Sequence, residues 1–140
     1  MAESSVNTGV ALASLAFRWH NQAHEVLTPL KLSTTQYLLL SGVQIISETQ
    51  EHVTQAAVGR LVGADAMLVS KNIRTLEENK FIERRVHPVD SRAWSVKLTK
   101  SGAATLKNAA KQLGKIESNT FGKGGSEKLY KPLVQALGWG

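Results

Sequence analysis

Apolar residues recur at three- and four-residue spacing between residues 6 and 30, a pattern that predicts a long amphipathic helix ending near Pro29. One apolar line along this helix contains Val10, Ala13, Phe17 and Leu27. A second helix is expected to begin at Ser33, because Gln36, three residues later, completes a capping box. The first quarter of the chain is therefore expected to be helical.

Two shorter helices are expected next. Thr54 can cap a helix over residues 55–62, and Gly63 can end it. Asp65 is a good N-cap for a further helix, whose buried side would consist of Val69, Ile73 and Leu76. The two helices are separated only by the tight turn at residues 63–65.

Residues 81–87 and 93–98 have the alternation of short strands, and the polar segment 88–92 between them predicts a β-hairpin. A long helix is expected from Thr99 to about Asn119, and a last one from Ser126, after the glycine-rich segment 122–125. The predicted fold class is mainly α with a small β-hairpin: a winged helix-turn-helix flanked by N-terminal and C-terminal helices.

A length of 140 residues fits a single domain, so we expect one domain over residues 1–140. The absence of cysteine excludes disulfides, thiolate metal sites and cysteine-based redox sensing. An acidic residue and no basic one precede the apolar stretch 10–17, the wrong order for a signal peptide, and the apolar run 37–46 is too short to span a bilayer. We therefore expect a cytoplasmic protein.

The net charge of +6 is unevenly distributed. Residues 1–53 carry a net charge of −2, whereas residues 54–100 and 101–140 carry +4 each. A basic surface suits a polyanion, because each lysine or arginine placed against a phosphate releases a counterion. Many basic proteins bind no nucleic acid, however, so charge alone does not predict function.

The order of helix, tight turn, helix and basic hairpin is typical of proteins that place one helix in the DNA major groove and a loop in the adjacent minor groove. The helix after Asp65 would present Ala66, Met67, Ser70, Lys71 and Arg74 to the DNA. Ser70 and Lys71 can bind bases or phosphates, Arg74 is suited to the backbone, and Met67 to a thymine methyl group. The alternative interpretation is an ordinary solvated helix face.

In the hairpin, Arg92 is placed to enter the minor groove, where a narrow A·T-rich segment concentrates negative potential. Asp90 would hold this arginine or the loop in shape, and Arg84 and Arg85 on the first strand would add charge near the phosphates. The alternative is that Asp90 and Arg92 form a surface ion pair that closes the turn.

Residues 53–106 resemble the MarR family of winged-helix regulators. The most specific pieces are Leu-Glu-Glu at 76–78 with Ile-Glu-Arg-Arg at 82–85, Asp-Ser-Arg at 90–92 and Leu-Thr-Lys-Ser-Gly at 98–102. Leu-Ser-Thr-Thr-Gln-Tyr at 32–37 also resembles the family's entry into its second helix. One departure is the apolar Ala-Met-Leu at 66–68, where many members have arginine, serine or threonine.

The resemblance implies an obligate homodimer, formed by helices at about 6–30 and 100–138, that carries a winged helix-turn-helix at about 33–98. It also implies binding to a pseudo-palindromic double-stranded DNA site and a role as a repressor. The resemblance further implies that DNA is released when a small aromatic or phenolic effector occupies a cleft. Apolar stripes on the end helices also favour dimerisation.

Other residues leave alternatives open. Trp19 can line an effector cleft or pack in the core, and His20 and His24, four residues apart, can face such a cleft, respond to pH or share a metal, although no third ligand is evident. No catalytic trio or nucleotide loop is found, so neither an enzyme nor a cofactor is expected. The remaining alternative is a winged-helix dimer that serves as a protein-interaction module without specific DNA binding.

Overall fold

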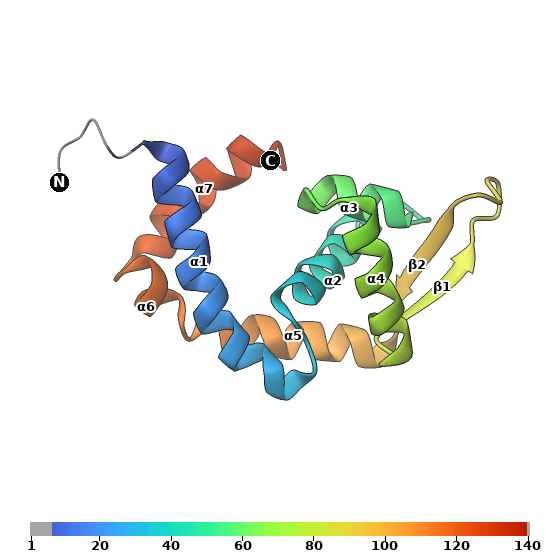
Figure 1. Ribbon diagram of the computed structural model, residues 1–140, viewed down its shortest axis with the longest axis horizontal. Coiled ribbons are helices and arrows are strands. Elements are labelled where there is room, and N and C mark those ends of the chain that lie inside the picture. Colours follow the sequence, from blue (N-terminus) through green and yellow to red (C-terminus); the bar gives the residue numbers. More distant parts are fainter. Residues whose placement is uncertain (1–6, 140) are drawn as a thin grey trace. The chain divides into compact units, whose positions relative to one another are not determined.

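The computed structural model describes residues 7–139 of the chain. These residues divide into two units, residues 27–110 and residues 7–26 with 111–139, and each unit is described by itself. The described part is helical apart from one two-stranded antiparallel sheet and its connections, which confirms the predicted fold class (Figure 1). No helix within residues 7–139 is long and apolar enough to cross a membrane.

The unit of residues 27–110 is the winged helix-turn-helix. Its elements are a 3₁₀ turn Thr28–Leu30, α2 Thr34–Ser47, α3 Gln55–Val62, α4 Ala66–Glu78, β1 Ile82–Val86, β2 Trp94–Leu98 and the first eleven residues of α5 Lys100–Gly114. Ser33 forms the predicted capping box of α2: its hydroxyl accepts from the Gln36 amide, and the Gln36 side chain accepts from the Ser33 amide, at 3.1 and 3.0 Å.

The hairpin pairs Ile82 with Leu98 and Val86 with Trp94, so one sheet face contains residues 82, 84 and 86 and the other residues 83 and 85. A short third partner joins β2, because the Val96 amide donates to the Val53 carbonyl at 2.8 Å and Thr54 forms a bridge with Ser95. The wing is thereby connected to the segment that leads into α3.

Apolar side chains from α2, α3, α4, α5 and both strands form the core of this unit. The largest fully buried ones are Leu27, Leu39, Leu40, Val43, Val58, Val69, Ile73, Leu76 and Ile82. The close packing of the helices depends on two small residues: a Cβ on Gly42 would lie 3.1 Å from Val58, and one on Gly59 would lie 3.1 Å from Val69. The helix-turn-helix is therefore packed as one body.

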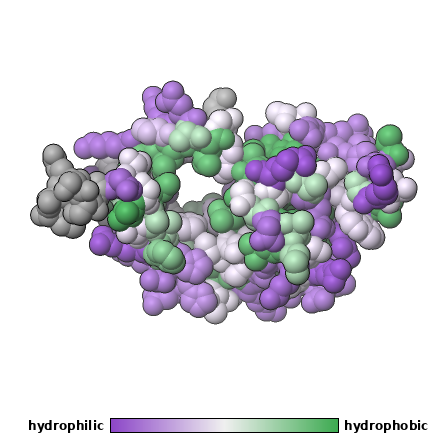
Figure 2. All heavy atoms as spheres, turned by 45° about the horizontal axis from the view of Figure 1, so that its top comes forward, coloured by the Kyte–Doolittle hydropathy of each residue, from purple (hydrophilic) through white to green (hydrophobic). Residues whose placement is uncertain are grey.

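The second unit contains α1 Thr8–Leu27 up to residue 26, the end of α5, α6 Glu117–Phe121 and α7 Gly125–Leu137. The buried Thr120 hydroxyl donates to the side-chain oxygen of Gln22, which joins α6 to α1. Several large apolar side chains of this unit are exposed, namely Val10, Leu12, Phe17, Tyr130, Leu133, Leu137 and Trp139. Figure 2 shows hydrophobic residues at the surface among hydrophilic ones.

The helix expected from Thr99 to about Asn119 is interrupted. It ends at Gly114, and a separate short helix, α6, follows. The amides of Lys115 and Ile116 donate to carbonyls three residues back, at Gln112 and Leu113, which tightens the chain into a turn. Glycine has low helix propensity, and this favours a break at that point.

Gly102 lies where the first turn of α5 meets the start of the wing. A Cβ there would lie 1.8 Å from the Phe81 carbonyl oxygen, a backbone atom that cannot rotate away. We expect Gly102→Ala to lower the free energy of unfolding by about 1–3 kcal/mol through steric overlap, as measured by urea denaturation. Gly114→Ala is the matched control, because nothing lies within 4 Å of its added Cβ. Equal stability of the two variants would contradict the proposed overlap.

Candidate nucleic-acid interface

The ends of α3 and α4 are fixed by the residues that the sequence singled out. Thr54 Oγ1 accepts from the Ala57 amide at 3.1 Å, and Asp65 Oδ1 accepts from the Leu68 amide at 2.9 Å. Gly63 has a φ of +75°, a left-handed conformation that glycine adopts readily, and it ends α3. Thr54 thus fixes the start of α3, and Gly63 and Asp65 set the turn between the two helices, as predicted.

The rotation of α4 about its axis is set by the burial of Val69, Ile73 and Leu76. The opposite face is left exposed and contains Ala66, Met67, Lys71 and Arg74, while Ser70 is half-buried beside them. Met67 is 84% exposed, so this large apolar side chain contributes almost nothing to the core. The face combines apolar, hydroxyl and cationic groups, which can contact base edges and phosphates.

The loop of the wing is shaped by side chains that accept hydrogen bonds from its backbone. His87 Nδ1 accepts from the amides of Val89 and Asp90, both at 3.1 Å. Asp90 Oδ1 accepts from the Arg92 amide at 3.1 Å and from its Nε at 3.4 Å. The Arg92 side chain is nevertheless 91% exposed, so its charge faces solvent from an organised loop.

His87 did not emerge from the sequence as a loop-forming residue. Its role depends on the backbone turning so that two amides point at one ring nitrogen, and no spacing pattern in the sequence signals that arrangement. Asp90 was expected to hold Arg92 or the loop, and its contacts are of that kind.

The two arginines of β1 have different environments. Arg85 is 82% exposed and lies 3.6 Å from the Glu83 carboxylate. The Arg84 side chain is 17% exposed, lies 3.5 Å from Glu77 of α4 and stacks on the Trp94 ring at 4.3 Å. A contact of Arg84 with DNA remains a prediction, but this guanidinium is already engaged within the protein.

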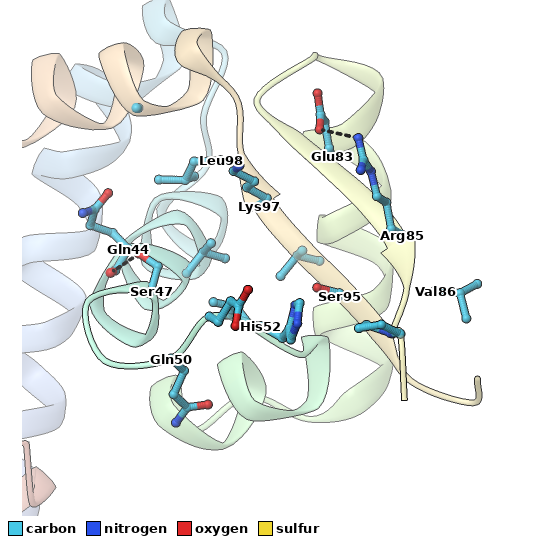
Figure 3. A pocket seen from close by; sticks show the side chains of 16 residues that line it. Gln44, Ser47, Gln50, His52, Glu83, Arg85, Val86, Ser95, Lys97 and Leu98 are labelled. Carbon is cyan, nitrogen blue, oxygen red and sulfur yellow. Dashed lines mark hydrogen bonds and ion pairs between the residues drawn. The ribbon is translucent and has the colours of Figure 1, made fainter. Parts of the chain in front are cut away.

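A cavity of about 720 Å³ is bounded by β1, β2, α2 and residues 50–53. In Figure 3, Gln44 and Ser47 of α2 lie on one side of it and Glu83 and Arg85 of β1 on the other. Lys97 and Ser95 of β2 and residues 50–53 also contribute to its wall. Its lining thus offers cationic, carboxylate, hydroxyl and amide groups together with apolar residues that include Val43, Val96 and Leu98.

The residues predicted for an effector cleft lie on α1, where Trp19 is half-buried and His20 and His24 are exposed. None of the three lines the cavity described above. Within residues 7–139 no group of three histidine, cysteine or acidic residues could hold a metal ion, so the histidine pair lacks a third ligand there. Their role in an effector cleft stays a prediction.

A second, smaller hollow of about 420 Å³ lies between α3 and α4 and is lined in part by Gln55, Arg60 and Ala66. It belongs to the same surface as the exposed face of α4. Lys71, Arg74 and Arg60 of the helix-turn-helix and Arg92 of the wing all belong to the unit of residues 27–110 and are exposed.

The chain was compared with known proteins. No model of a known protein family matches it. It is 28% identical, over 95% of its length and 90% of the relative's, to the uncharacterized HTH-type transcriptional regulator YdcH of Bacillus subtilis. A MarR-family transcriptional regulator from Rhodococcus sp. RHA1 superposes with a TM-score of 0.83 at 19% identity, over 98% of this chain and 96% of that one.

CouR from Rhodococcus jostii RHA1 is also similar in structure. Its complex with p-coumaroyl-CoA gives a TM-score of 0.78 at 20% identity, over 95% of this chain and 90% of that one. The transcriptional repressor CouR bound to a 23-mer DNA duplex gives 0.76 at 21% identity, over 99% and 94%. These findings confirm the resemblance: the chain has the fold of MarR-family regulators, and the proteins it matches are regulators rather than enzymes.

The cap of α4 can be tested without DNA. Asp65→Ala removes the acceptor of the Leu68 amide and is expected to lower the free energy of unfolding by about 1 kcal/mol, with faster amide exchange confined to the first turn of α4. Asp65→Asn keeps a side-chain oxygen and should retain most of the stability. Asn and Ala variants of equal stability would argue against the cap.

Proposed function

We propose that the chain is a DNA-binding transcriptional regulator of the MarR type that recognises a pseudo-palindromic duplex as a homodimer. The observation that carries the proposal is the exposed cationic and hydroxyl face of α4 in the same unit as the exposed wing arginine, Arg92. A helix enters the major groove with such a face, and an arginine loop enters the minor groove. The fold that this chain shares with CouR, solved on a 23-mer duplex, supports it.

Each residue has a proposed task. Ser70 and Lys71 contact bases or phosphates, Arg74 contacts the backbone, Ala66 and Met67 lie against base edges, and Arg85 and Arg92 contact the DNA beside the wing. Asp90 organises the loop through its bonds to the Arg92 backbone and side chain. The backbone contacts set the register of the protein on DNA, and the base contacts select the sequence.

Homodimerisation is proposed through the helices of the other unit. Exposed large apolar side chains on α1 and α7, among them Phe17, Tyr130 and Leu137, support it, because contiguous apolar surface is costly to leave in water. A two-fold dimer would present two α4 helices about one helical turn of DNA apart.

We further propose repression relieved by a small-molecule effector. Support comes from the cavity of about 720 Å³, whose lining combines apolar residues with polar groups and charges of both signs, a composition that can hold an aromatic or phenolic compound and bind its polar groups. The structure of CouR with p-coumaroyl-CoA is a further support. Because Arg85 and Lys97 belong to the strands of the wing, a ligand there can favour one wing conformation over another.

The alternative function is a protein-interaction module. Its supporting observation is the exposed apolar surface at the start of α4, where Met67 is 84% and Leu68 40% exposed. The basic wing argues against it.

The experiment that separates the two is fluorescence anisotropy with a duplex selected from a random library by the wild-type protein, and with a scrambled duplex, across about 50–200 mM salt. We expect roughly a thousand-fold preference for the selected duplex and a steep salt dependence. Weak and equal binding to both duplexes would favour the interaction module.

Arg92→Ala is expected to weaken binding of the selected duplex by about 1–3 kcal/mol, most strongly where A·T pairs flank the site, because the wing then loses its minor-groove cation. Lys107→Ala is the control, since it removes one positive charge from the exposed side of α5. Anisotropy titrations at fixed salt provide the measurement. Equal losses in the two variants would show that only net charge matters.

Met67 can be tested against the methyl groups of thymine. Replacing thymine by uracil at the contacted position should cost the wild-type protein about 0.8 kcal/mol, or roughly fourfold in Kd, for one methyl contact. Met67→Ala should abolish this difference, and Met67→Leu, which keeps an apolar side chain, should retain it. A thymine preference that survives in Met67→Ala would assign the contact to another residue.

A further inference from the structure

Arg84 is half-buried, although it was expected at the DNA surface. It lies in the middle of β1, on the sheet face shared by Ile82 and Val86, whereas Arg85 points to the opposite face. Its side chain is 17% exposed, compared with 82% for Arg85 and 91% for Arg92. A long cationic side chain is rarely buried to this extent unless it has partners.

Those partners come from two different elements. The Arg84 Nη2 atom donates to Glu77 Oε1 at 3.5 Å, and Glu77 lies in the last turn of α4. The guanidinium carbon lies 4.3 Å from the centre of the Trp94 ring, and Trp94 is the first residue of β2 after the wing loop. One side chain thus contacts both α4 and β2, the strand that follows the wing loop.

These contacts connect β1 to α4 and to the start of β2. Exposed ion pairs contribute little to stability, but here the Arg84 side chain is 17% exposed and that of Glu77 38%, so the pair is partly shielded from solvent. Stacking on tryptophan adds a cation–π attraction. The buried Arg84 Nε has no hydrogen-bond partner, so the guanidinium is held by the Glu77 carboxylate and the Trp94 ring. A two-stranded hairpin is marginally stable by itself, so its orientation depends on contacts of this kind.

We propose that Arg84 is a positioning residue that fixes the wing relative to α4, so that Arg92 and Lys71 reach the same duplex at once. The inference rests on the proposed DNA-binding function. Holding two contact points in a binding geometry lowers the entropy lost on association. In this role the residue acts through the position of Arg92 rather than through a DNA contact of its own.

A double-mutant cycle tests the proposal with the intact protein and the selected duplex. We expect Arg84→Met to weaken binding by on the order of tenfold. In the Arg84→Met background, Arg92→Ala should cost less than about threefold, well below its effect in the wild type, because the wing is no longer held. Arg85→Met, the same change at the next position of the strand, should combine additively with Arg92→Ala.

Two outcomes overturn the inference. Additive losses for Arg84→Met and Arg92→Ala, with the salt slope reduced by about one, would mean that Arg84 contacts a phosphate. Additive losses with an unchanged slope and a lower urea midpoint would mean that Arg84 only stabilises the fold. If Arg84→Met does not fold, Glu77→Gln replaces it in the cycle, because it removes the other half of the ion pair.

A DNA-free measurement separates this inference from the proposed function. Amide exchange of Val89, Asp90 and Arg92 should accelerate in Arg84→Met and in Glu77→Gln, and Arg84→Lys should recover part of the protection by restoring a cation. If the wild type selects no duplex, the proposed function fails, while the exchange rates still decide whether Arg84 holds the wing. Unchanged exchange rates in both variants would overturn the inference that Arg84 holds the wing.

Discussion

The burial of Val69, Ile73 and Leu76 is the constraint on which the rest of the interface depends. These side chains lie on one stripe of α4 and pack into a core shared with α2, α3 and the sheet. A helix that buries one stripe presents the opposite one, so Met67, Lys71 and Arg74 face solvent as a consequence of core packing. Gly59 permits this packing because a side chain there would press on Val69.

In β1, successive side chains point to opposite faces of the sheet and so have different roles. Glu83 and Arg85 line the cavity, while Arg84 points to the other face and contacts Glu77 of α4. Adjacent arginines of one strand therefore belong to different surfaces. Arg85 at the cavity and Arg84 beside α4 are neighbours in the chain, so β1 connects the cavity to α4 directly.

Much of the fold could be predicted because its signals are local. The caps at Ser33, Thr54 and Asp65 depend on residues three positions apart, and each forms as expected. The break at Gly114 was missed, because a lysine-rich apolar repeat continues past it. The partners of Arg84 were also missed: Trp94 lies across the hairpin and Glu77 on another element, and only the alternation of Ile82, Arg84 and Val86 hinted that this arginine faces inward. The cavity could not be foreseen, since α2, a loop and two strands combine to form it.

Because the start of α4 is apolar, the proposed DNA recognition depends more strongly on the geometry of the wing. Ala66, Met67 and Leu68 carry no side-chain hydrogen-bond donor, and a bidentate base contact contributes about 1–3 kcal/mol of discrimination that this turn cannot supply. The proposed DNA recognition therefore requires selectivity from methyl contacts, from Ser70 and Lys71, and from the shape of the minor groove at Arg92. Readout of groove shape requires a cation held at a defined distance from the major-groove helix. The bonds from His87 and Asp90 organise the tip of the wing, and the contacts of Arg84 hold its base against α4.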